Sequence, residues 1–104
     1  MNGLNAWCEV TVLRLKDCLL GNAGAVTLAE AIASFLPASL VELGLEGNAI
    51  QEGGGRALAE TIHLSTNLTS LSLYMNYLQA GGGRALAETL RLNTTLRSLD
   101  LGEN

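Results

Sequence analysis

Leucines and polar residues alternate in one short pattern that occurs four times along this chain. The clearest copy places Leu68, Leu71 and Leu73 on an apolar stripe and ends on Asn76. The same pattern begins at residues 40 and 96, and a looser copy begins at residue 10. From 10 to 40 is 30 residues, and from 40 to 68 and from 68 to 96 are 28 residues each. A repeat with this nearly constant period predicts a solenoid, in which each unit packs on its neighbours.

Each copy predicts one short strand with a single apolar face. Leu71 and Leu73 alternate with Ser70 and Ser72, and alternation of this kind is typical of a half-buried strand. Strands stacked at a constant period run parallel, and parallel neighbours require a crossover that is usually helical. We therefore expect an α/β chain with strands over 12–15, 42–45, 70–73 and 99–101, and helices over 24–35, 54–64 and 82–92.

Several other residues have predicted roles in this scaffold. The asparagine that closes each copy, such as Asn76, is expected to bond buried backbone groups of the turn. Cys18 stands in the same position of the first copy and is expected to be a buried thiol. Trp7 is expected to cover the outer end of the first repeat, and Pro37 to end the first helix. The apolar stripe of that helix is predicted to comprise Val26, Leu28, Ala29, Ile32 and Phe35.

The pattern LxxLxLxxNxL with a 28-residue period resembles a leucine-rich repeat. The helical half, seen as Gly82-Gly83-Arg84-Ala85-Leu86-Ala87-Glu88-Thr89-Leu90 with Asn93 to Leu96, is similar to the ribonuclease-inhibitor-like class. That class includes the C-terminal repeats of NOD-like receptors, and its first repeat often carries cysteine in place of asparagine. The resemblance covers about residues 8–104. It implies one domain over 1–104, a right-handed horseshoe arc with a parallel sheet on the concave face and helices on the convex face. The repeats cover about 10–39, 40–67 and 68–95, with a partial repeat over 96–104.

Composition narrows the classes of partner and the compartment. The net charge is −4 over 104 residues, which disfavours nucleic acid and anionic membranes because both attract basic surfaces. No apolar run reaches the length of a spanning helix, and the N-terminus does not resemble a signal peptide. The two cysteines, Cys8 and Cys18, do not suggest a disulfide framework, so we expect a cytoplasmic protein. We discount the two glycosylation triplets at Asn67 and Asn93.

Candidate sites for chemistry are few. Glycine runs at 53–55 and 81–83 precede helices, where free amides bind anions, but no phosphate-loop Lys-Ser/Thr follows. We interpret Gly54 and Gly82 as positions where helix and neighbouring backbone approach closely. Arg56 with Glu60, and Arg84 with Glu88, are expected to pair on the helix surface. His63 is expected to be exposed, and neither a metal-ligand spacing nor a nucleophile motif is present. We therefore expect no enzyme activity and no cofactor.

Candidate binding residues stand where successive repeats differ. Between the second and third repeats the leucines are kept, whereas non-leucine positions of the strand and its turn change. The resemblance places these positions on the concave face and its rim, where ribonuclease-inhibitor-like repeats generally bind partners. Tyrosine and methionine are suited to contact sites, which favours Tyr74 and Met75. The candidate partner-binding residues are Arg14, Lys16, Glu42, Glu46, Ser72, Tyr74, Met75, Tyr77 and Asp100.

The resemblance implies a module that binds a protein partner through its concave face, within a longer sensor or scaffold array. Self-association through the strand edge near Leu96–Leu101 is an alternative partner interaction. Two other functions remain open. The same repeat class includes GTPase-activating proteins for Ran, although none of their catalytic residues can be assigned to this chain. A structural spacer segment without a binding role is the other alternative.

Overall fold

The computed structural model describes residues 10–35 and 38–104. Within them, short strands alternate with longer helices, as the repeat predicts. The expectations for Trp7, Cys8 and Pro37 lie outside the described residues. The elements are, in chain order, β1 (Val12–Arg14), α2 (Gly21–Phe35), β2 (Glu42–Gly44), α3 (Glu52–Leu64), β3 (Ser70–Ser72), α4 (Gln79–Leu92) and β4 (Ser98–Asp100).

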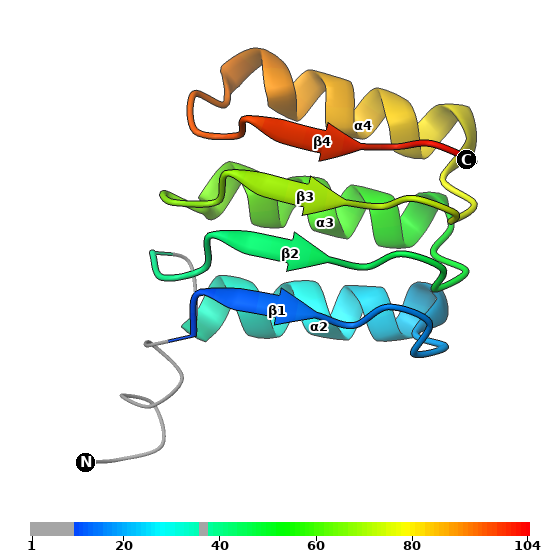
Figure 1. Ribbon diagram of the computed structural model, residues 1–104. Helices are drawn as coiled ribbons and strands as arrows, with labels where there is room; N and C mark the ends of the chain where they lie inside the picture. Colours follow the sequence, from blue (N-terminus) through cyan, green and yellow to red (C-terminus); the bar gives the residue numbers. More distant parts are fainter. Residues whose placement is uncertain (1–9, 36–37) are drawn as a thin grey trace.

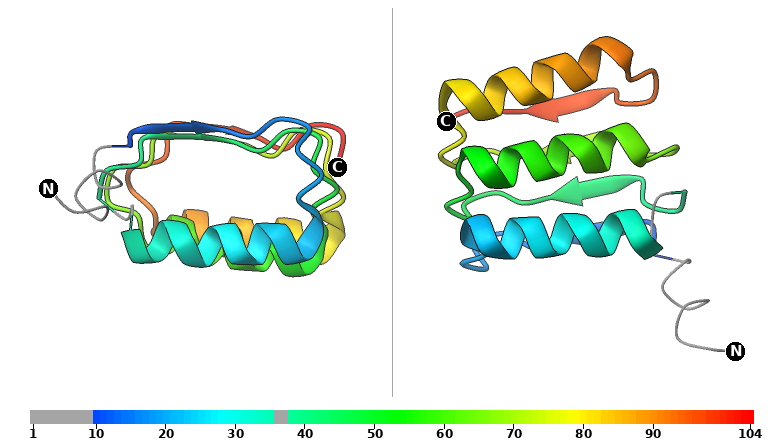
Figure 2. Two further views of the ribbon diagram at one scale, coloured as in Figure 1. Left: turned by 90° about the horizontal axis from the view of Figure 1, so that it is seen from below. Right: turned by 180° about the vertical axis from the view of Figure 1, so that it is seen from behind.

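The strands form one sheet in the order β1-β2-β3-β4, and every neighbouring pair is parallel. Each helix is the crossover between two consecutive strands (Figure 1). Figure 2 shows the sheet and the helices as two layers, with all three helices on the same side of the sheet. In the described part of the chain, the opposite face of the sheet carries no helix. This arrangement confirms the predicted α/β repeat fold and is consistent with a leucine-rich-repeat arc.

The core lies between the two layers and is built from columns of equivalent apolar residues. The strand leucines stand in register, with Leu13 beside Leu43, Leu43 beside Leu71, and Leu71 beside Leu99. Leu43 and Leu71 are each 1% exposed, whereas Leu13 and Leu99 are only partly buried because each has one neighbouring strand. Complete burial of a leucine contributes about 1.5–3 kcal/mol, so the middle repeats contribute most to the stability of the fold.

Asparagines connect each repeat to the one before it. The Asn76 side chain accepts hydrogen bonds from the backbone N–H groups of Asn48 and Ile50, both at 3.0 Å. It donates to the carbonyl oxygens of Leu45 and Leu73, also at 3.0 Å. Asn48 repeats this arrangement with the first turn, and Asn104 with the third. The buried role predicted for Asn76 is confirmed, and most of its partners belong to the preceding repeat.

The prediction of a buried Cys18 thiol is wrong. Cys18 is exposed and unpaired, although its backbone N–H donates to the Asn48 side chain at 2.9 Å. Its thiol contacts the Lys16 carbonyl at 3.5 Å. Because burial of this position depends on a repeat stacked on either side, a residue in the outermost described turn remains open to solvent.

The helices also differ in detail from the expectation. Each begins two or three residues earlier than predicted, because the glycines lie within the first turns of the helix. In α2 the buried residues are Ala25, Ala29 and Ile32, so Ala25 was missed. Phe35, predicted to be in the apolar stripe, is 41% exposed at the end of the helix. Val26 and Leu28 are only partly buried.

No helix in the described part of the chain is both long enough and apolar enough to span a membrane.

Candidate functional site

The face of the sheet opposite the helices presents the non-leucine residues of the strands. One row across this face comprises Arg14, Gly44, Ser72 and Asp100, which occupy equivalent positions on the four strands. Arg14 also forms an ion pair with Glu42 of the next strand, with 2.8 Å between Nη2 and Oε2. Both side chains are exposed, so this pair contributes at most about 1 kcal/mol.

The next row lies just past the ends of the strands, where backbone hydrogen bonds still join the segments that follow neighbouring strands. Asp17 N–H donates to the Glu46 carbonyl at 2.9 Å, and Gly47 N–H donates to the Tyr74 carbonyl at 3.0 Å. Met75 N–H donates in the same way to Gly102 at 3.0 Å. These bonds hold the turns side by side, so their side chains are presented from a fixed backbone.

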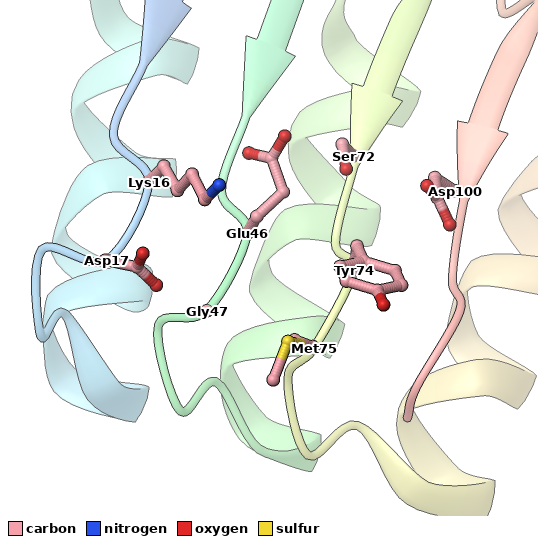
Figure 3. Close-up of a pocket in the computed structure, with 8 residues that line it drawn as sticks. All are labelled: Lys16, Asp17, Glu46, Gly47, Ser72, Tyr74, Met75 and Asp100. Atoms are coloured by element: carbon pink, nitrogen blue, oxygen red, sulfur yellow. The ribbon is translucent and has the colours of Figure 1, made fainter.

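A shallow open pocket of about 490 Å³ lies where these two rows meet. We call it the turn groove. Figure 3 shows that its side chains come from all four repeats. Tyr74 lies near the middle, between Glu46 and Asp100, while Lys16 extends from the turn after β1 toward Glu46. The turn groove is lined by Lys16, Asp17, Glu46, Gly47, Ser72, Tyr74, Met75 and Asp100.

Most of the candidate binding residues come together here. Six of the nine line the turn groove, namely Lys16, Glu46, Ser72, Tyr74, Met75 and Asp100. Arg14 and Glu42 lie on the same sheet face but are paired with each other. Tyr77 lies past the turn and outside the lining, with its N–H bonded to the Ile50 carbonyl. Whether any of the nine binds a partner remains a prediction.

Asp17 and Gly47 line the groove although neither is among the nine candidates. They share the repeat position of Met75 and so belong to the non-leucine turn positions that change between repeats. All three have positive φ, at 54°, 65° and 57°. This left-handed conformation is easy for glycine and costs other residues roughly 1–2 kcal/mol. Met75 therefore holds an apolar side chain, 56% exposed, on a backbone that would suit glycine.

The Tyr74 ring is held on one side by the last repeat. A Cβ atom placed on Gly102 would lie 3.0 Å from the Cδ2 atom of Tyr74, so the ring packs directly against this glycine. The residue is 39% exposed, so part of the ring is open to solvent. An aromatic side chain that is fixed on one side and free on the other loses little conformational entropy on binding.

The glycine runs at the helix starts have a structural role in this fold. A Cβ atom on Gly54 would lie 2.6 Å from Ile50 Cγ2 and 3.0 Å from Ala25 Cβ, which confirms the predicted close approach. Asn22 accepts hydrogen bonds from Gln51 N–H at 3.0 Å and Gly54 N–H at 2.7 Å, and so caps α3 from the preceding repeat. These amides are therefore not free for an anion.

The helix face offers weaker candidates. Arg56 pairs with Glu52 at 2.6 Å rather than with Glu60, so that expectation is wrong. A glutamate four residues before the basic residue is the more favourable order on a helix. Within the described residues, 10–35 and 38–104, Arg84 forms no ion pair. His63 is exposed as expected, and no three metal-ligating side chains gather in the described residues.

One comparison with known proteins identifies the type of repeat. A family model described as "Leucine Rich repeat" matches residues 92–104, which include the end of α4, β4 and Asn104. No curated protein matches the chain. Residues 92–104 therefore form a leucine-rich repeat, and the parallel strands place the other three copies of the pattern in register with it.

Proposed function

We propose that this chain is a protein-interaction module that binds its partner through the sheet face, centred on the turn groove. Leucine-rich repeats generally serve as interaction modules, which supports this class of function. The observation that carries the site is the exposure of Tyr74 and Met75 beside a groove whose floor is formed by a hydrogen-bonded backbone. Both residue types are common at the centres of protein interfaces.

The burial pattern supports this choice of face. The leucines of the strands are turned into the core, so the apolar surface on this face is supplied by residues that the core does not require. Met75 is the clearest case, because glycine would occupy its backbone position with less strain. Asp17 and Glu103 share this conformation, so the strain belongs to the turn, and the feature specific to Met75 is its exposed apolar side chain.

The groove also supports a mode of binding with little backbone change. The turns that carry Lys16, Glu46 and Tyr74 are joined by a continuous set of backbone bonds. A partner would therefore meet preformed side chains, and binding would not require the ordering of a loop. We place this module in a sensor or scaffold protein of the cytoplasm, where the exposed and unpaired thiol of Cys18 would stay reduced. We propose no catalytic role.

The test begins with selection of binding peptides from a displayed library against the immobilised chain. The binding surface is then mapped by amide chemical shifts in the ¹⁵N-labelled protein. We expect shifts at the turns after β1 to β4 and not along α2 to α4. The double variant Tyr74→Ala/Met75→Ala should reduce affinity at least tenfold, and Tyr77→Ala should reduce it less.

Leu92→Ala is the matched control, because Leu92 is an apolar residue of α4 that is 75% exposed. Its affinity should equal that of the parent chain. Circular dichroism melting of each variant separates loss of binding from loss of fold. Binders that map to the helices, or that tolerate the double variant, would contradict the proposal.

A further inference from the structure

We infer that the turn groove takes an arginine side chain of the partner, with its guanidinium over Tyr74 and between Glu46 and Asp100. This inference rests on the proposed function and specifies the chemistry of the partner at that site. Its basis is the charge of the groove together with the position of the aromatic ring. The lining contains one cation, Lys16, and three carboxylates, Asp17, Glu46 and Asp100, so its formal charge is 1 − 3 = −2.

These carboxylates are not neutralised within the described residues. Glu42, on the same face, has Arg14 as its partner at 2.8 Å. In the described part of the chain no ion pair or side-chain hydrogen bond reaches the carboxylates of Glu46 or Asp17. Asp100 accepts a single bond, from Gly102 N–H at 3.0 Å, and has further acceptor capacity. The groove therefore complements a cationic group supplied by the partner.

The positions of the charges determine where this cation would lie. Lys16 extends from the turn after β1 toward the chain after β2, so its ammonium repels a second cation on that side of Glu46 (Figure 3). Glu46 follows β2 and Asp100 ends β4, so the two acids lie on opposite sides of Tyr74, which follows β3. Two strand spacings and an offset of two residues along the strand separate their backbones, which is roughly 12 Å. The favourable position is therefore over the aromatic ring.

Arginine suits this position better than lysine. Its planar guanidinium stacks on an aromatic face while its N–H groups bond acceptors at the edge. Lysine would present one compact charge without the stacking surface. Met75 follows Tyr74 in the lining and is 56% exposed, so it offers an adaptable contact to an apolar residue next to the arginine.

The experiment uses three probe peptides of one sequence, acetyl-Leu-Xaa-Leu-amide, in which Xaa is arginine, lysine or citrulline. Citrulline keeps the shape of arginine and removes its charge. Affinity is measured by amide chemical-shift titration of the ¹⁵N-labelled chain. We expect the arginine peptide to bind at least tenfold more tightly than the citrulline peptide and several-fold more tightly than the lysine peptide. Its affinity should fall as the salt concentration rises.

The double variant Glu46→Gln/Asp100→Asn should weaken the arginine peptide at least fivefold. The substitutions are close in shape, and asparagine keeps the side-chain oxygen that accepts from Gly102. The control Glu60→Gln/Glu88→Gln removes the same charge from exposed helix positions and should leave affinity unchanged. Equal binding of citrulline or lysine, or unchanged affinity in the groove variant, would overturn the inference.

Failure here can be distinguished from failure of the proposed function. If the selected library peptides still depend on Tyr74 and Met75 but show no preference for arginine, only the inference fails. If those peptides bind elsewhere, both fail.

Discussion

The replacement Asn76→Ala tests the physical link between repeats most directly. The Asn76 side chain is 1% exposed and bonds four buried backbone groups at 3.0 Å. Alanine leaves the N–H groups of Asn48 and Ile50 without an acceptor, and it leaves two carbonyls without this donor. An unsatisfied buried group costs about 1–3 kcal/mol.

The expected loss of stability follows from these groups. The two stranded N–H groups alone predict about 2–6 kcal/mol. Water that enters the space of the lost side chain would bond some of these backbone groups. We therefore expect the free energy of unfolding to fall by about 3 kcal/mol. A chain of this size would then melt roughly 12–24 °C lower, at about 4–8 °C for each kcal/mol. Urea unfolding followed by circular dichroism measures the change in the free energy of unfolding.

The stability loss of Asn76→Ala can be compared with the losses expected for two equivalent asparagines. Asn48→Ala should cost less than Asn76→Ala, because it acts on the turn around the exposed Cys18. Asn104→Ala should cost least, because Asn104 is itself exposed. A melting temperature for Asn76→Ala within about 3 °C of the parent, or a reversed order among the three variants, would refute the reasoning, since roughly 1 kcal/mol accounts for 4–8 °C.

The remaining predictions concern glycines, the strained turn and a helix cap, and each is measured by the same urea unfolding. Gly54→Ala should destabilise the fold by about 1–3 kcal/mol, because the added Cβ would meet Ala25 at 3.0 Å. Gly83→Ala should stabilise it by up to about 1 kcal/mol, because nothing lies within 4 Å of an added Cβ in this helical position. Met75→Gly should leave stability within about 1 kcal/mol of the parent, because relief of backbone strain is offset by the greater entropy of unfolded glycine, while partner affinity falls. Asn22→Ala should cost about 1 kcal/mol, because α3 loses its cap.

Each of these expectations has a contrary result. Similar effects of Gly54→Ala and Gly83→Ala would show that close packing does not govern the first of them. A large loss of stability in Met75→Gly would assign Met75 to the core rather than to a binding surface. Unchanged stability in Asn22→Ala would show that the Asn22 cap does not stabilise α3.

Part of the candidate site was predictable because it depends on register. Residues spaced by one repeat stand beside each other, so the positions of Lys16, Glu46 and Tyr74 follow from the period of the pattern. The pairing of Arg56 with Glu52 could also have been predicted from the sequence, since this order is the more favourable one on a helix. The cap that Asn22 provides for α3 could not be predicted from the sequence. This contact joins two repeats, and the leucine pattern does not describe the residues that make it.

The amino-acid sequence by itself determined the repeat, the parallel sheet, the inward leucines and the buried role of Asn76. These features depend on periodicity, and periodicity is a property of the chain alone. Only the tertiary structure decided that Cys18 is exposed, that Tyr74 packs on Gly102 and that the carboxylates of the turn groove have no ion pair among the described residues. Exposure and pairing depend on which side chains stack on each other across repeats, and residues far apart in the chain make those contacts.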